Sequence, residues 1–230
     1  MLRRPETGGM RAAIYWAPEL HDPLHAAGSA WLGRDAETAA PVQQPPIPGI
    51  ADVTANPRGY GLHATLKPPF RLAHGYAALI EDAAEWAARV APFTLPPLAV
   101  QDLKGFLALR ETLPCPALHA LADAAVTQLD QHRALASEAE LERRRTSGLT
   151  PVQAALLLDW GYPYVLMEWQ FHLTLTHRLA PGAAARIRPL AEAHFAGLLE
   201  QPRVVGSVCI FTQAGPGHPF LIAERLSLRG

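Results

Sequence analysis

Apolar and polar residues alternate along the chain with two different periods, separated by prolines and glycines. A period of two predicts strands, because successive side chains of a strand point to opposite faces. A period near 3.6 predicts helices with one apolar face. The segments predicted as strands are 11–16, 60–67, 98–103, 106–111, 165–177, 204–212 and 219–227. The segments predicted as helices are 21–33, 75–91, 116–129, 137–145, 151–160 and 183–199.

Prolines also predict where several elements begin and end. Pro68 and Pro69 are expected to stop strand 60–67, because proline cannot donate a hydrogen bond to a strand ladder. Thr150 followed by Pro151 is typical of a helix N-terminus. Five prolines between residues 35 and 58 predict a long loop. Such a loop is either part of a binding site or a surface connection.

The order of the predicted elements repeats along the chain. The middle and last thirds each contain a strand with a His-x-Thr-Leu motif, then a helix, then two strands. This repetition indicates an internal duplication of elements. The strand pairs joined by short turns indicate antiparallel sheets, so we expect an α+β fold. We expect residues 10–230 to form a single domain, preceded by a disordered tail at 1–9.

Composition narrows the classes of function. Of the 230 residues, 49 % are hydrophobic and 18 % charged, and the net charge is −1. The chain lacks a strongly basic footprint, which argues against a long nucleic acid as partner. It has neither an apolar leader nor about 18 consecutive apolar residues, so we expect no membrane partner and a cytoplasmic location. Cys115 and Cys209 suit a reducing compartment.

Two His-x-Thr-Leu motifs are the most informative features, and their polar residues are His63, Thr65, His172 and Thr174. Both motifs lie on predicted strands, so the histidine and the threonine of each motif share one face. The apolar neighbours then point to the opposite face, into a core. Each motif therefore presents an imidazole and a hydroxyl side by side, about 7 Å apart along the strand.

This pairing of groups suits the cleavage of a phosphate ester. The reaction needs a base for the attacking oxygen and an acid for the leaving oxygen, and two imidazoles can serve both purposes at neutral pH. The threonine hydroxyls can donate hydrogen bonds to the non-bridging oxygens, where negative charge collects. We expect His63, Thr65, His172 and Thr174 to be catalytic, without a metal or other cofactor. Which histidine is the base stays open.

Other residues are candidates for substrate binding. Lys67 lies two residues after Thr65, so we expect it on the same face, either neutralising phosphate or solvated at the strand end. Tyr15 could stack on a base or sugar, or pack in the core. Arg143 and Arg144 could bind a second phosphate, or form a solvated helix face paired with neighbouring glutamates.

At the two motifs the chain resembles the 2H phosphoesterase superfamily. It is most similar to one branch, DUF1045, whose members are often encoded with phosphonate-utilisation genes. The resemblance rests on RAAIYWAP at 11–18, Trp31 to Asp35, YGLHATLKPPFRL at 60–72, GLTPVQAALLLDWGYPYV at 148–165 and FHLTLTHRL at 171–179.

The resemblance implies two lobes related by pseudo-twofold symmetry, each contributing one motif to a shared cleft. It implies hydrolysis of cyclic nucleotide phosphates or terminal RNA cyclic phosphates, or ligation of RNA ends. We expect a phosphodiesterase that acts on a cyclic phosphate of a small nucleotide or sugar, and the resemblance implies a role in phosphonate metabolism. A binding module for a phosphorylated metabolite and an RNA-end cyclic phosphodiesterase are the alternatives. The sequence does not predict the oligomeric state.

Overall fold

The computed structural model describes residues 9–136, 142 and 148–230. Residues 1–8, which make up nearly all of the expected tail, lie outside the described residues. So do Arg143, Arg144 and Arg145, together with almost all of the helix expected at 137–145. In the described part, no helix combines the length and apolar character needed to span a membrane.

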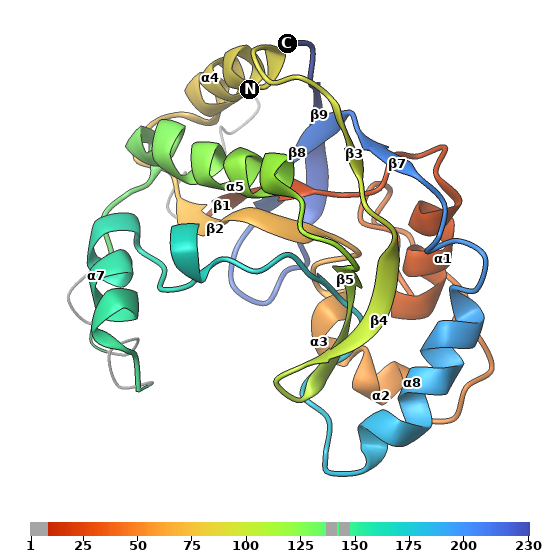
Figure 1. Cartoon of the computed structure of the whole chain (residues 1–230). Helices are drawn as coiled ribbons and strands as arrows, with labels where there is room; N and C mark the ends of the chain where they lie inside the picture. The colour runs from red at the N-terminus through yellow and green to blue at the C-terminus, as the bar shows by residue number, and fades with distance from the viewer. Residues whose placement is uncertain (1–8, 137–141, 143–147) are drawn as a thin grey trace, which may run out of the picture.

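The larger sheet joins strands from both ends of the chain (Figure 1). All of its strand pairs are antiparallel. In spatial order its strands are β2 (Ala64–Arg71), β1 (Arg11–Trp16), β8 (Ser207–Gln213) and β9 (Leu221–Ser227). β1 lies between two strands and is buried on both faces: Ile14 and Trp16 belong to the main core, and Ala13 and Tyr15 to a second apolar cluster.

A second antiparallel sheet and a short ribbon complete the strand pairing. The sheet has the order β4 (Leu98–Leu103), β5 (Phe106–Glu111) and β6 (Leu173–Thr174). The ribbon pairs β3 (Phe93–Leu95) with β7 (Arg203–Val205). β2, the strand of the first motif, therefore shares a sheet with the β8–β9 hairpin, and β6, the strand of the second motif, shares one with the β4–β5 hairpin. In both cases the hairpin comes from the other half of the chain. The short strands β3 and β7, each just before one of these hairpins, pair with each other. This exchange matches the expected duplication and the α+β, two-lobed arrangement.

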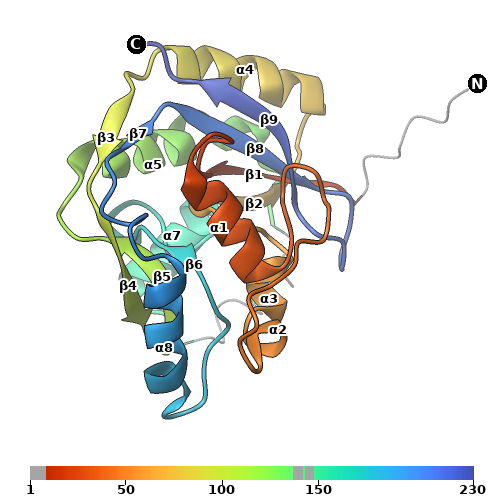
Figure 2. The ribbon, with the colours of Figure 1, turned by 90° about the vertical axis from the view of Figure 1, so that its right-hand side faces the viewer.

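Helices cover both sheets. Figure 2 shows α4 along β9 and α8 beside the β4–β5 hairpin, at opposite ends of the molecule. The described helices are α1 (Pro23–Leu32), α2 (Ile50–Val53), α3 (Ala55–Arg58), α4 (Tyr76–Ala88), α5 (Pro116–Gln128), α7 (Pro151–Trp160) and α8 (Ala183–His194). Two 3-10 turns are η1 (Asp130–His132) and η2 (Leu166–Glu168).

The N-terminus of α7 confirms the helix start that was predicted at Thr150 and Pro151. The Thr150 side chain accepts a hydrogen bond from the Gln153 backbone N–H, and the Gln153 side chain accepts one from the Thr150 N–H. This reciprocal capping satisfies two backbone donors that a helix end leaves without partners. At the other end, Gly161 takes a left-handed conformation with φ of 73°, which glycine adopts without steric cost.

Two expectations about proline were wrong. β2 continues through Pro68 and Pro69 to Arg71. It lies at the edge of its sheet, where one side of the ladder has no neighbour and the missing proline donors are tolerated. The segment 35–58 is not a bare loop, because it contains α2 and α3.

The strand expected at 165–177 was also largely wrong. Only Leu173 and Thr174 form a strand, and η2 precedes them. The backbone instead bonds to several neighbours: Leu175 N–H donates to Leu107 O at 2.9 Å, and His177 N–H donates to Val53 O at 2.7 Å. The strand expected at 204–212 is divided into β7 and β8 at position 206.

Candidate active site

The two motifs occupy equivalent places in the two sheets. His63 directly precedes β2 and Thr65 lies inside it, while His172 directly precedes β6 and Thr174 lies inside it. All four side chains are partly exposed. The apolar residues between and beside them are buried: Leu62, Ala64, Leu66, Phe171, Leu173 and Leu175. The alternation expected from the sequence is therefore present at both motifs.

Backbone carbonyls fix the tautomer of each histidine. His63 Nδ1 lies 2.9 Å from Gly61 O, and His172 Nδ1 lies 2.8 Å from Gln170 O. A carbonyl oxygen can only accept, so each Nδ1 carries the proton and donates. Each Nε2 is then left as the basic nitrogen. His63 Nε2 lies 3.4 Å from Thr65 Oγ1, a long contact that a substrate oxygen can displace.

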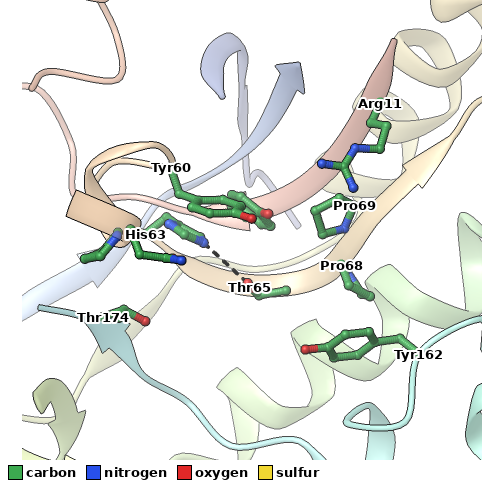
Figure 3. Close-up of a pocket in the computed structure, with 11 residues that line it drawn as sticks. Arg11, Tyr60, His63, Thr65, Pro68, Pro69, Tyr162 and Thr174 are labelled. Atoms are coloured by element: carbon green, nitrogen blue, oxygen red, sulfur yellow. Dashed lines mark hydrogen bonds between the residues drawn. The ribbon is translucent and has the colours of Figure 1, made fainter. Parts of the chain in front are cut away.

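Two adjoining cavities bring the motifs together. The first, of about 330 Å³, is lined by His63, Thr65 and Thr174 among others. The second, of about 320 Å³, is lined by His172 and again by Thr65. Figure 3 shows His63 and Thr174 at one end of the first cavity, with Thr65 beside them. Thr65 lines both cavities, so the cavity of His63 and the cavity of His172 adjoin at this residue.

Aromatic rings surround the His63 imidazole. Tyr15 stacks on it with a centroid distance of 4.0 Å, Tyr60 lies 5.8 Å away, and Phe211 lies 5.7 Å away. Burial among these rings lowers the pKa of His63 to about 4, against the opposing effect of the Gly61 carbonyl. Positive charge on His172 lowers the pKa of His63 further.

His172 has a different environment. Its ring meets the edge of Phe106 at 5.8 Å. Burial lowers the pKa of His172, the hydrogen bond to Gln170 O opposes this, and the Arg110 charge lowers the pKa further. For His172, unlike His63, no ring stacks face to face against the imidazole among the described contacts.

Lys67 does not lie where the sequence suggested. Thr65 pairs with Tyr15 and Lys67 with Ile14, so two steps on β2 match one step on β1. This irregularity turns Lys67 away from the face of Thr65. Its side chain is only 2 % exposed, and its ammonium donates to Asp130 Oδ1 at 2.7 Å and to Val126 O at 3.1 Å. Lys67 lies outside the linings of both cavities.

Tyr15 lines the first cavity but is only 1 % exposed. One face of its ring is taken by His63, and Phe211 packs against it at 4.8 Å. This leaves little surface on which a base could stack. Burial raises the pKa of its phenol well above the usual value, and a hydrogen bond with the Thr65 side chain opposes that shift. The position suits Tyr15 to orienting His63 and Thr65.

Several residues that line the cavities were not proposed as substrate-binding residues. Arg11 lines the first cavity, and Lys104 and Arg178 line the second. Arg11 could have been found from the sequence, because it is four residues before Tyr15 and a strand places both on one face. Asn56 and Pro57 of α3 also line the first cavity, which favours the binding-site interpretation of the proline-rich segment.

Known proteins resemble this chain in sequence, and some solved structures align with it. Two curated proteins named ribose 1,5-bisphosphate phosphokinase PhnN are similar. The one from Janthinobacterium sp. (strain Marseille) is 39 % identical over 231 residues, covering 96 % of this chain and 51 % of that protein. The one from Laribacter hongkongensis (strain HLHK9) is 40 % identical over 223 residues, covering 94 % of this chain and 51 % of that protein. The chain thus spans about half the length of these relatives.

Among solved structures, E. coli LigT complexed with 3'-AMP aligns with a TM-score of 0.47 at 13 % identity, covering 96 % of this chain and 99 % of that chain. A crystal structure of a phosphoesterase aligns with a TM-score of 0.45 at 13 % identity over the same shares. A family model described as "Protein of unknown function (DUF1045)" matches residues 65–221. That match covers more than half of the sequence, and the chain belongs to the DUF1045 family.

Proposed function

We propose that this chain is a phosphodiesterase that hydrolyses a cyclic phosphate of a small nucleotide or sugar phosphate. One observation carries the proposal: the two His-x-Thr motifs line adjoining cavities that share Thr65. Each histidine is held by a carbonyl at Nδ1, which leaves Nε2 for proton transfer. Two such groups near one ligand are what an in-line displacement at phosphorus requires.

The proposed reaction uses these groups as follows. The phosphate group binds at the hydroxyls of Thr65 and Thr174, which donate hydrogen bonds to its non-bridging oxygens. A water oxygen attacks phosphorus and gives a proton to the base. The bond to the departing ring oxygen breaks as the acid gives that oxygen a proton. The product is a phosphomonoester with a free hydroxyl.

We assign the base to His63 and the acid to His172. The pKa of His63 is lowered to about 4, so this imidazole is neutral at neutral pH and able to accept a proton. His172 must hold a proton before the leaving oxygen departs. Burial also lowers the pKa of His172, and a bound anionic phosphate raises the pKa of both imidazoles; because His63 starts from about 4, we propose that His172 is the one that holds the proton. The scheme uses protein side chains alone, so EDTA is expected to leave the rate unchanged.

The relatives' name suggests a substrate range. They are named as kinases of ribose 1,5-bisphosphate. This chain contains no Gly-x-x-x-x-Gly-Lys-Ser/Thr segment, the usual phosphate loop of such enzymes, so we do not assign it the kinase reaction. We propose instead that it acts on a cyclic phosphate of a phosphorylated pentose or a nucleotide, met in phosphonate breakdown.

Incubation with a panel of cyclic nucleotide and sugar phosphates, followed by phosphorus NMR, tests this function. His63→Ala and His172→Ala are each expected to lower kcat/KM by about 100-fold or more. His177→Ala is the matched control, because that side chain is exposed and outside both cavity linings. Undiminished turnover in both motif variants contradicts the proposal. Binding of the same compounds without turnover supports the alternative, a binding module for a phosphorylated metabolite.

A further inference from the structure

We infer that the first cavity holds a second anion subsite at Arg11, and that the ligand carries a second phosphate group besides the one held at the two motifs. The inference rests on the proposed function for the position of the first phosphate. It names a substrate class: small sugar or nucleoside cyclic phosphates that also bear a phosphomonoester.

Arg11 is a fixed cation. Its Nε and Nη2 both donate to Gln213 Oε1, at 2.8 and 2.6 Å. The Gln213 amide is oriented by its own donation from Nε2 to His218 O at 2.7 Å. The guanidinium carbon also lies 5.5 Å from the centroid of the Phe220 ring. These contacts hold the side chain at β1 without neutralising it.

The protein as described supplies no carboxylate to Arg11. None of the ion pairs found among the described residues includes it. Two other arginines with little exposure are paired, Arg203 with Asp22 at 2.7 Å and Arg133 with Asp130 at 2.7 Å. Arg34 donates instead to the backbone carbonyls of Arg58, Gly59 and Phe220, and it does not line the first cavity as Arg11 does. An oriented guanidinium held by a neutral amide, facing a cavity, is suited to bidentate recognition of a phosphate.

Arg11 lines two neighbouring cavities. It lines the cavity of His63 and also a smaller one of about 70 Å³, which Arg71 and Arg133 line as well. Figure 3 shows Arg11 at the opposite end of the first cavity from His63 and Thr174, with its guanidinium pointing toward the interior. Pro68 and Pro69 lie along the wall between the two ends.

The spacing fits a ligand with two separated phosphates. Arg11 and Tyr15 are four residues apart on β1, about 13 Å along a strand. Tyr15 stacks on His63, which marks the catalytic end of the cavity. This separation leaves room for a sugar between a phosphate at Thr65 and a second phosphate at Arg11. A ligand with a single phosphate would leave one end without its anion.

Equilibrium titration tests the subsite without requiring turnover. The probes are ribulose 1,5-bisphosphate and ribulose 5-phosphate, which differ by one phosphate. The protein should bind the bisphosphate about tenfold or more tightly than the monophosphate, and Arg11→Gln should abolish that difference. Arg188→Gln, a change at an exposed arginine of α8 paired with Glu192, should preserve it. Arg11→Lys, which keeps the charge, should restore part of it.

A turnover arm uses adenosine 2',3'-cyclic phosphate with and without a 5'-phosphate. Arg11→Gln should raise KM only for the 5'-phosphorylated compound. Equal affinity of the two pentose phosphates for the unaltered protein, no binding of the bisphosphate, or an equal loss for both ligands in Arg11→Gln overturns the inference. Failure of the proposed function is separate: it appears as turnover that His63→Ala and His172→Ala leave unchanged, whatever the titration shows.

Discussion

The indole N–H of Trp169 donates a hydrogen bond of 2.7 Å to the backbone carbonyl oxygen of Thr65. Trp169 lies three residues before His172, so this hydrogen bond links the segment just before the second motif to the strand of the first motif. Trp169 also lines the second cavity and is only 6 % exposed. The relative position of the two motifs therefore depends on a contact between segments more than 100 residues apart.

Trp169→Phe keeps most of the ring and removes this donor. The Thr65 carbonyl loses a buried partner, so the free energy of unfolding should fall by about 1 kcal/mol. Displacement of one motif relative to the other should lower kcat by about tenfold. Urea unfolding and steady-state kinetics measure the two effects. Trp160→Phe, on α7 and outside both linings, is the control. A destabilised variant with unchanged kcat would limit Trp169 to a structural role.

Tyr60→Ala tests the cause of the lowered pKa of His63. Removing one of the surrounding rings admits water to the imidazole, so the pKa should rise from about 4 toward the ordinary 6.5. The base acts unprotonated, so activity is lost as pH falls below its pKa. The acid limb of kcat/KM should therefore lie near pH 4 in the unaltered enzyme and at higher pH in Tyr60→Ala.

Tyr60→Phe retains the ring and should keep the acid limb where it is. Imidazole NMR titration of the same proteins assigns the change to His63. An acid limb that does not move in Tyr60→Ala would show that the ring does not set the protonation of the base.

Lys67→Met tests whether this lysine stabilises the fold or binds the substrate. The change removes a buried ammonium from Asp130, although Arg133 remains within 2.7 Å of that carboxylate. The free energy of unfolding should fall by about 2 kcal/mol, and kcat/KM of the folded fraction should change less than about twofold. Lys67→Met with Asp130→Asn should recover part of the stability. A loss of about 100-fold in kcat/KM with unchanged stability would show that Lys67 binds the substrate.

The positions of His63, Thr65, His172 and Thr174 relative to their apolar neighbours could be predicted, because the alternation along an extended chain is local. The position of Lys67 could not be predicted in this way. The irregular pairing of β2 with β1 intervenes between Thr65 and Lys67, and it depends on how two distant segments meet. The passage of β2 through Pro68 and Pro69 is similar, since only the sheet order shows that this strand lies at an edge.

The environment of Arg11 could be predicted only in part. Its place on the face of Tyr15 follows from the period of a strand. Its lack of an acidic partner among the described residues depends on Gln213 and Phe220, which are more than 200 residues away along the chain. No local pattern distinguishes such an arginine from a solvated one.

A crystal structure of the protein with vanadate, which mimics the five-coordinate phosphorus of the transition state, would show whether both motifs act on one phosphorus atom. We expect one vanadate beside Thr65, with oxygens about 2.6–3.2 Å from both His63 Nε2 and His172 Nε2 and within reach of the Thr174 hydroxyl. A vanadate held by one motif alone, with the other histidine beyond hydrogen-bonding distance, would contradict a shared active site.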